Sequence, residues 1–178
     1  MSSQLILKAA HFSAQKHSKQ RRKDEDASPY INHPISVAKI ISEIGNVEDP
    51  EVLAGALLHD TLEDTETTVE ELIENFGERV CILVQQVTDD KNLPKLQRKQ
   101  RQIDHAKEIL EGAALIKLGD KISNVTDITN TPPTNWDSNR RLEYFDWAEK
   151  VINNCPQVNE KLENYFKASI QKGREKLQ

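Results

Sequence analysis

The sequence predicts an all-α fold, a bundle of helices. In nearly every segment apolar residues recur every three or four positions, which is the spacing of one face of an α-helix. No segment of useful length alternates strictly between apolar and polar residues, as strands do, and there is no glycine-rich phosphate loop. At 178 residues the chain fits one domain, 1–178, with a single hydrophobic core.

In the first third of the chain, capping residues predict where helices begin and end. An amphipathic first helix is expected over residues 5–19, where it leads into a basic run. Pro34 suits the first position of a second helix, and Gly45 suits its stop. Asp49 opens a third helix, expected over residues 50–59.

The middle of the chain predicts three more helices. Residues 67–71 (TTVEE) offer a capping box for a helix that ends at Gly77. Residues 80–87 match the helical i, i+3, i+4, i+7 template. A basic helix is expected after Pro94, and its apolar positions are Leu96, Ile103, Ala106 and Leu110. Glu111-Gly112 predicts a break.

After that break the sequence predicts a strongly apolar helix around residues 115–125. Its opposite face carries four polar residues at helical spacing, namely Lys117, Asp120, Asn124 and Asp127. This polar face could be exposed to solvent, or it could line a polar cavity. Two last helices are expected around residues 142–152 and 162–170, where apolar residues again repeat at helical spacing.

Basic residues are concentrated in two segments of an acidic chain. The net charge is −5, yet residues 16–23 and 91–101 each hold five basic residues and no acidic one. This concentration suggests a localised anion such as a phosphate-rich small molecule, and we expect both segments to converge on one pocket. A solvated basic face is the alternative for each segment. Nucleic acid is not an expected partner, because neither segment interleaves aromatic residues.

No targeting or membrane signal is evident. No stretch approaches the roughly 20 apolar residues needed to span a bilayer, so no membrane partner is expected. Residues 1–4 lack a basic region followed by an apolar one, so no signal peptide is expected. Cys81 and Cys155 are too few and too isolated for a disulfide framework, so we expect free thiols and a cytoplasmic protein.

Residues 54–65 (AGALLHDTLEDT) carry the densest chemistry, because an apolar run leads into His59, Asp60, Glu63 and Asp64. Adjacent helical residues point about 100° apart. His59 and Asp60 can therefore reach one ion only if the helix ends or bends there, or if the ion lies between several helices. Carboxylates this close repel one another unless a cation lies among them. A solvated helix end is the simpler alternative, but ligand candidates elsewhere in the chain favour a metal site.

Two distant residues complete a candidate ligand set. His33 stands at a helix entrance, and Asp120 lies on the polar face of a later helix. Together with His59 and Asp60 they offer two imidazoles and two carboxylates. This set suits manganese, iron or zinc and leaves positions for water on an octahedral ion. Glu63 and Asp64 are then spare carboxylates that can handle protons, so metal-assisted phosphate hydrolysis is the expected chemistry.

Longer motifs connect the chain to a known family. The His59-Asp60 pair, with distant His33 and Asp120, resembles the HD superfamily of metal-dependent phosphohydrolases. More specific are residues 29–35 (PYINHPI), 57–65 (LLHDTLEDT), 87–91 (VTDDK), 117–121 (KLGDK) and 143–148 (EYFDWA). Together they resemble the hydrolase domain of RelA/SpoT proteins, above all its stand-alone small alarmone hydrolases and metazoan SpoT homologues. The resemblance covers about residues 9–151.

This resemblance implies an alarmone hydrolase of the stringent response, with a guanosine nucleotide as its small-molecule partner. Such enzymes remove the 3′-pyrophosphate of guanosine tetra- or pentaphosphate (ppGpp or pppGpp) with one Mn²⁺ ion. The implied metal ligands are His33, His59, Asp60 and Asp120. The implied catalytic carboxylates are Glu63 and Asp64. The implied substrate-binding residues are Arg22, Lys23, Asn124, Arg140 and Tyr144. Gly119 stands where the family usually has alanine, which is expected to loosen the helix beside Asp120.

Two other functions stay open at this point. A related HD-type phosphatase could remove the 2′-phosphate of NADPH, since both substrates carry a phosphoryl group on a ribose secondary hydroxyl. A non-catalytic nucleotide sensor is the third reading, but a pure binder gains nothing from the extra charges of Glu63 and Asp64 beside a polyanion. Sequence does not separate tetra- from pentaphosphate, and it leaves the oligomeric state open.

Overall fold

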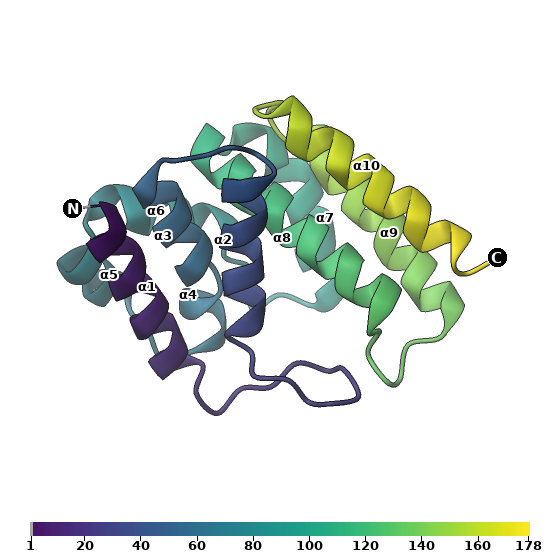
Figure 1. Ribbon diagram of the computed structural model, residues 1–178, viewed down its shortest axis with the longest axis horizontal. Coiled ribbons are helices and arrows are strands. Elements are labelled where there is room, and N and C mark those ends of the chain that lie inside the picture. The colour runs from purple at the N-terminus through teal and green to yellow at the C-terminus, as the bar shows by residue number, and fades with distance from the viewer. Residues whose placement is uncertain (1) are drawn as a thin grey trace.

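A computed structural model describes residues 2–178, and every regular element in that range is a helix (Figure 1). The helices are α1 (Ser2–Lys16), α2 (Asn32–Glu43), α3 (Pro50–Leu58), α4 (Thr61–Asp64), α5 (Val69–Phe76), α6 (Glu78–Val87), α7 (Lys95–His105), the 3₁₀ helix η1 (Ala106–Glu108), α8 (Glu111–Asn130), α9 (Ser138–Asn154) and α10 (Glu160–Glu175). The all-α prediction is confirmed.

Helix α8 lies at the centre of the bundle. It contacts α2, α3 and α6 on one side and α9 and α10 on the other (Figure 1). Its apolar residues Leu118, Ile122 and Val125 are buried against α9 and α10, while Ile116 joins the cluster under α2 and α3. A polar side chain on α8 that faces α2 and α3 therefore points into the interior. Within residues 2–178, no helix combines the length and the hydrophobicity needed to cross a membrane.

Several predicted helix ends are confirmed by their capping interactions. The Asp49 carboxylate accepts a hydrogen bond from the backbone N–H of Glu51 (3.0 Å) at the start of α3. Thr68 Oγ1 accepts one from the N–H of Glu71 (3.1 Å) at the start of α5. The carboxylate of Glu71 forms an ion pair with Lys16 (2.8 Å) instead of closing the capping box. Gly77, with a φ of 85°, ends α5 in a conformation that favours glycine.

The first two helices differ from their predicted bounds. Helix α1 ends at Lys16 and not near residue 19, because residues 17–20 turn sharply, with the N–H of Gln20 donating to the carbonyl of His17 (2.9 Å). Helix α2 begins at Asn32, two residues before Pro34, so His33 lies in its first turn, at the helix entrance as expected. It ends at Glu43, two residues before the predicted stop at Gly45.

The predicted break at Glu111-Gly112 is wrong. Glu111 is the first residue of α8, and Gly112 lies in its first turn. A Cβ atom at Gly112 would lie 2.9 Å from Leu83 Cδ2 and 3.2 Å from Val52 Cγ2. This glycine therefore permits close packing of α8 against α3 and α6, and does not stop a helix.

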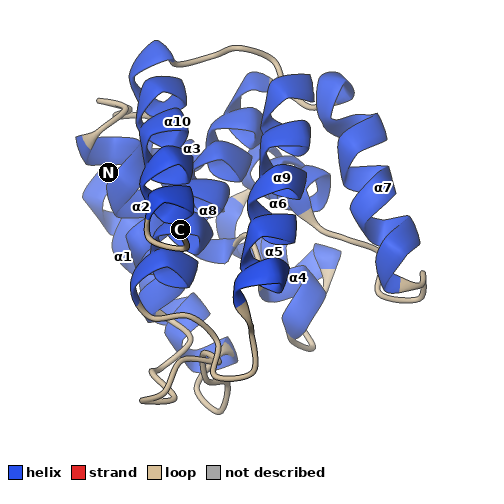
Figure 2. Ribbon diagram, turned by 90° about the vertical axis from the view of Figure 1, so that its right-hand side faces the viewer, coloured by secondary structure: helices blue, strands red, loops and turns tan. Residues whose placement is uncertain are grey.

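The apolar face predicted for the basic helix is also wrong. Helix α7 has no buried residue, and the Leu96 side chain is 80% exposed. Helix α7 ends at His105, so Ala106 falls in η1 and Leu110 precedes α8. Figure 2 shows α7 at the edge of the bundle, where it packs on α9. Its long basic side chains are therefore available to line surface cavities.

Gly119 brings α2 and α8 close together, one residue before Asp120. A Cβ atom here would lie 2.7 Å from Ile41 Cγ1 and 3.2 Å from Val37 Cγ1. The expectation that this glycine loosens the helix misses its main effect. Because α2 carries His33 and α8 carries Asp120, the close approach at Gly119 helps to set the distance between these two side chains.

We predict that Gly119→Ala destabilises the protein despite the higher helix propensity of alanine. Overpacking a well-filled core costs about 1–3 kcal/mol, and replacing a helical glycine recovers about 1 kcal/mol. The free energy of unfolding in urea should therefore fall by up to about 2 kcal/mol. Metal affinity should fall as well, because α2 must shift away from α8. A Gly119→Ala protein that is more stable than the parent would contradict this account of the glycine.

Candidate metal centre and catalytic site

The central His-Asp pair lies at an interruption between two helices. Helix α3 ends at Leu58, and α4 begins at Thr61 after Asp60 takes backbone angles of −98° and 0°. Thr61 Oγ1 donates to the carbonyl of Leu58 (2.7 Å), which satisfies an acceptor at the helix end. His59 Nε2 and Asp60 Oδ2 lie 3.0 Å apart. The predicted helix end at this pair is confirmed, and it allows neighbouring residues to face one point.

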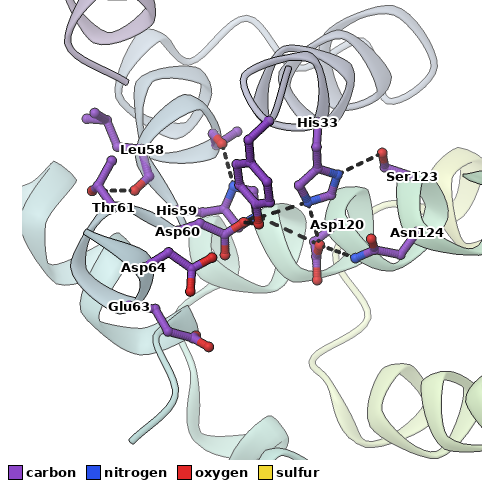
Figure 3. Close-up of polar contacts among 12 residues, drawn as sticks. His33, Leu58, His59, Asp60, Thr61, Glu63, Asp64, Asp120, Ser123 and Asn124 are labelled. Atoms are coloured by element: carbon purple, nitrogen blue, oxygen red, sulfur yellow. Dashed lines mark hydrogen bonds and ion pairs between the residues drawn. The ribbon is translucent and has the colours of Figure 1, made fainter. Parts of the chain in front are cut away.

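His33 and Asp120 reach the same point from α2 and α8 (Figure 3). His33 Nε2 lies 3.1 Å from Asp120 Oδ1 and 3.8 Å from Asp60 Oδ2. His59 Nε2 lies 3.8 Å from Asp120 Oδ1. One ligand atom each from His33, His59 and Asp60 lies within 4.8 Å of the others. Four side chains from three separate segments thus surround one small volume.

The two imidazoles are oriented so that each presents Nε2 to this volume. His59 Nδ1 donates to the carbonyl of Ala56 (2.8 Å), and His33 Nδ1 lies 3.1 Å from Ser123 Oγ. Nε2 of His59 is buried, and the polar atoms that it faces are carboxylate oxygens of Asp60 (3.0 Å) and Asp120 (3.8 Å). Metal-ligating histidines are typically held through their other nitrogen in this way. The four side chains, which we call the metal centre, therefore fit a divalent cation.

The carboxylates of the metal centre are held by three neighbours, of which the sequence singled out only Asn124. Tyr30 donates its hydroxyl to Asp60 Oδ2 (2.6 Å). Lys121 contacts Asp120 Oδ2 (2.9 Å), and Asn124 Nδ2 donates to Asp120 Oδ1 (2.6 Å). Tyr30 and Lys121 both lie inside the motifs that carry the family resemblance. Nothing else in the sequence indicated that these two residues support the metal centre.

Protons balance part of the negative charge in the metal-free protein. Burial alone disfavours a charged His59, but Asp60 and Asp120 outweigh it and raise the pKa of His59 to about 9. Burial lowers the pKa of His33, and the nearby carboxylates do not overcome this effect. Burial likewise opposes ionisation of Asp60, yet the adjacent His59 keeps the pKa of Asp60 below its usual range. The cluster therefore favours positive charge at its centre.

Glu63 and Asp64 lie beside the metal centre and line the same cavity, of about 180 Å³ (Figure 3). Glu63 Oε2 accepts a hydrogen bond from the backbone N–H of Asp89 (3.0 Å). Burial raises the pKa of Glu63 to about 7. Asp64 accepts from Gln20 Nε2 (3.0 Å) and pairs with the ammonium of Lys91. Glu63 can thus exchange a proton near neutral pH, while Asp64 is held by two donors.

A buried histidine supports Asp64 through one intermediate residue. His17 Nδ1 and Gln20 Oε1 lie 2.6 Å apart. Because the Gln20 amide donates to Asp64, its oxygen faces His17, so His17 Nδ1 is the donor. The His17 ring also packs on Tyr30, with centroids 4.8 Å apart. His17 follows buried Ser13 at four-residue spacing, a signal that sequence reasoning did not use.

Most of the predicted substrate-binding residues share a second cavity. Arg22, Lys23, Asn124 and Tyr144 line a space of about 640 Å³ that adjoins the metal centre at His33. The polar face of α8 thus lines cavities instead of facing bulk solvent, which decides between the two alternatives. Arg140 lies apart from this set. It lines a neighbouring cavity of about 440 Å³, on which Tyr144 also borders.

Only one or two side chains of each basic segment approach the metal-centre cavity, and none of the cavities that residues 2–178 form around this centre is lined by both segments. The prediction that both segments converge on one pocket is therefore wrong. From residues 16–23, Arg22 reaches the metal-centre cavity, while Lys16 pairs with Glu71 elsewhere. From residues 91–101, Lys91 contacts Asp64, and the basic side chains of α7 line other cavities. The segments therefore border adjacent cavities around one centre.

Comparison with known proteins identifies the family. The family model described as HD domain matches residues 9–143, most of the chain. The chain belongs to the HD-domain family. This HD-domain protein is 48% identical over 162 residues to guanosine-3′,5′-bis(diphosphate) 3′-pyrophosphohydrolase MESH1 of Mus musculus, an alignment that covers 91% of this chain and 90% of the relative. The MESH1 protein of Drosophila melanogaster is 44% identical over 158 residues, covering 89% and 88%.

A solved structure shares the fold of this HD-domain chain closely. It is described as a metazoan ortholog of SpoT that hydrolyzes ppGpp and plays a role in starvation responses. The two chains are 42% identical, the TM-score is 0.90, and the match covers 94% of each. The resemblance to the metazoan SpoT homologues, drawn from short motifs, is confirmed.

We predict that metal binding displaces a proton from His59. A ligating imidazole must be unprotonated, so metal affinity should rise with pH up to about 9 and weaken as the pH falls. At pH 7.5, binding of Mn²⁺ should release about one proton, because His59 is then still protonated in the metal-free protein. Calorimetry in two buffers of different ionisation enthalpy measures this number directly.

Two histidine variants provide the control. His59→Ala should abolish stoichiometric metal binding, whereas His105→Ala, at an exposed position on α7, should leave it unchanged. Elemental analysis that finds full metal content in His59→Ala would rule out His59 as a ligand.

Proposed function

We propose that this protein is a guanosine-3′,5′-bis(diphosphate) 3′-pyrophosphohydrolase that acts in the cytoplasm and uses one Mn²⁺ ion. The reaction consumes one water and converts guanosine tetraphosphate into GDP and pyrophosphate, or the pentaphosphate into GTP and pyrophosphate. One observation carries the proposal: the buried metal centre adjoins two further carboxylates, Glu63 and Asp64, in a chain that aligns over nine-tenths of relatives named for this activity.

The metal centre would hold the cation through His33, His59, Asp60 and Asp120. When bound, a divalent cation supplies Lewis acidity that activates water and stabilises charge on a phosphoryl group. Imidazole and carboxylate ligands suit Mn²⁺. Tyr30 and Lys121 keep Asp60 and Asp120 in place, since each donates to a carboxylate oxygen.

Glu63 is the residue best suited to take the proton of the attacking water. Its pKa of about 7 leaves a large fraction ionised at neutral pH while keeping the carboxylate basic. The backbone N–H of Asp89 fixes one of its oxygens. Asp64, held by Gln20 and Lys91, is suited to orient the water.

The 640 Å³ cavity is the proposed seat of the nucleoside. The Arg22 guanidinium donates to Asp127 (2.7 Å) and Asn124 (3.1 Å), so its position is set before substrate arrives. A planar guanidinium can stack on a guanine ring, which an ammonium cannot do. Lys23, Asn124 and Tyr144 border the same space, and Arg140 would act from the adjoining cavity.

Separation of reaction products tests the proposed function. Purified protein with Mn²⁺ is incubated with guanosine tetraphosphate in one series and with NADPH in another. We expect GDP and pyrophosphate from the first. Phosphate release from NADPH alone would establish the related phosphatase instead, and tight binding of guanosine tetraphosphate without cleavage would establish a sensor.

We predict that Glu63→Gln lowers kcat by about 10²–10⁴-fold, because general base catalysis typically contributes that much. KM and metal content should change little, since the amide keeps the shape of the side chain. The parent should lose activity as the pH falls and Glu63 is protonated. A bound cation lowers the pKa of Glu63, so this acid limb should lie at or below pH 7. With Mn²⁺ kept saturating at every pH, the limb should be absent in the variant. Glu66→Gln, an exposed change three residues away, is the control. Undiminished kcat in Glu63→Gln would remove Glu63 from the mechanism.

We predict that Arg22→Lys raises KM for guanosine tetraphosphate by about tenfold, because a stacked arginine on a nucleobase contributes about 1–2 kcal/mol that an ammonium does not supply. The charge is retained, so the loss reports on guanidinium geometry. Lys19→Arg, at an exposed position of the same basic segment, should leave KM within about twofold. Equal behaviour of the two variants would contradict stacking by Arg22.

A further inference from the structure

Lys117 is a buried ammonium with little to balance its charge. Its side chain is only 6% exposed, and among the ion pairs of residues 2–178 none involves Lys117. Its nearest polar contact is Gln102 Oε1 at 3.4 Å, which is long for a hydrogen bond. Gln102 in turn donates to Asp89 (2.6 Å), so an amide separates Lys117 from that carboxylate.

The other buried lysine of α8 shows what a balanced ammonium looks like in this fold. Lys121 pairs with Asp120 at 2.9 Å and lies over the ring of Trp147, 4.6 Å from its centroid. Lys117, one turn earlier, has neither kind of partner in the described chain. Burying a charge without a partner is expensive. Burial also lowers the pKa of Lys117, which an adjacent anion would oppose.

Lys117 lies between two cavities. It lines the 180 Å³ cavity of the metal centre and also a larger cavity of about 750 Å³ between α6 and α7. The larger cavity and the 180 Å³ cavity are both lined by Asp89, Gln102 and Lys117. The larger cavity has no lining residue in common with the 640 Å³ nucleoside cavity. The cavity of the metal centre therefore borders both spaces, and the 440 Å³ cavity borders both as well.

A second cation in the larger cavity also has free hydrogen-bonding capacity. Arg101 lies 4.0 Å from Asp90, and His105 Nδ1 lies 3.2 Å from Glu108, so both side chains already face carboxylates. Arg98 lines the cavity too, and its Nε is buried without a hydrogen-bond partner. After the paired groups are set aside, Lys117 and Arg98 are the cations that remain for a ligand.

We propose that Lys117 and Arg98 form an anion subsite that binds the pyrophosphate product as it leaves the metal centre, in a cavity separate from that of the nucleoside. This inference rests on the proposed function. With the nucleoside in the cavity of Arg22 and the scissile phosphoryl group at the metal centre, the terminal phosphoryl group extends past Lys117. Charge-assisted hydrogen bonds to phosphate oxygens would then satisfy both cations. Product would leave through the larger cavity without passing the bound GDP.

Calorimetry with sodium pyrophosphate and, separately, GDP tests the subsite in the full-length, Mn²⁺-loaded protein. Lys117→Met removes the charge at similar length and should weaken pyrophosphate binding by about 10- to 100-fold, the effect of one or two charge-assisted hydrogen bonds. GDP binding should change less than twofold. Lys39→Met, the same substitution at an exposed position on α2, should leave both affinities unchanged.

Arg98→Gln is the second variant, and it should weaken pyrophosphate binding at least threefold while the fold is retained. Unchanged pyrophosphate affinity in a folded Lys117→Met protein would overturn the proposal. If Lys117→Met does not fold, unchanged affinity in Arg98→Gln would overturn it. Turnover of guanosine tetraphosphate by the parent protein is measured in parallel. Turnover with unchanged pyrophosphate binding in the variants would reject the subsite alone, whereas absent turnover would reject the proposed function.

Discussion

Two partly buried carboxylates, Asp60 and Asp120, set the electrostatic requirement that the rest of the structure satisfies. Two negative charges this close repel each other unless positive charge or hydrogen-bond donors surround them. The protein surrounds them with donors: Tyr30 on Asp60, and Lys121 and Asn124 on Asp120. Two imidazoles face the remaining space, one with a pKa raised to about 9. A centre built in this way holds positive charge readily, as a proton without metal and as a divalent cation in the proposed enzyme.

Backbone geometry brings these groups together from three segments. A continuous helix would send His59 and Asp60 in different directions, and the interruption after Leu58 removes that obstacle. Helix α8 supplies Asp120 from the middle of the bundle, and the glycine before it allows α2 to approach with His33. The site thus depends on one helix end and one missing side chain, both a single residue away from a ligand.

Local features of the sequence predict a large part of this arrangement. Caps such as Asp49, Thr68 and Gly77 act on their own neighbours, so their helix ends can be predicted from short segments. The break predicted at Gly112 was wrong because this glycine packs against Leu83, which lies 29 residues earlier in the sequence. A local pattern cannot distinguish a glycine that ends a helix from one that allows close packing. The predicted burial of Leu96 was wrong for a related reason. Helical periodicity identifies an apolar face but does not show whether another element packs on it.

In the candidate site, too, some features could be predicted from local sequence and others depend on contacts between distant segments. The gathering of His33, His59, Asp60 and Asp120 could be expected, because the residue types and the helix end point to one ion. The supports of Asp64 could not, since Gln20 and Lys91 approach it from segments 44 and 27 positions away. The burial of Lys117 was also hidden, because a lysine on a polar helix face is ordinarily solvated.

Lys117 and Asp120 are three residues apart on α8, so this helix sets the spacing between the proposed anion subsite and the metal centre. At about 1.5 Å of rise per residue, the Cα atoms of these two residues lie about 4.5 Å apart along the helix axis. The rigid backbone of a central helix does not let this interval adjust. In the proposed subsite a pyrophosphoryl group would extend from the metal centre towards Lys117, whereas a single phosphate at the metal centre would leave the ammonium uncompensated. The enzyme would then select its substrate by the number of linked phosphoryl groups as well as by the base.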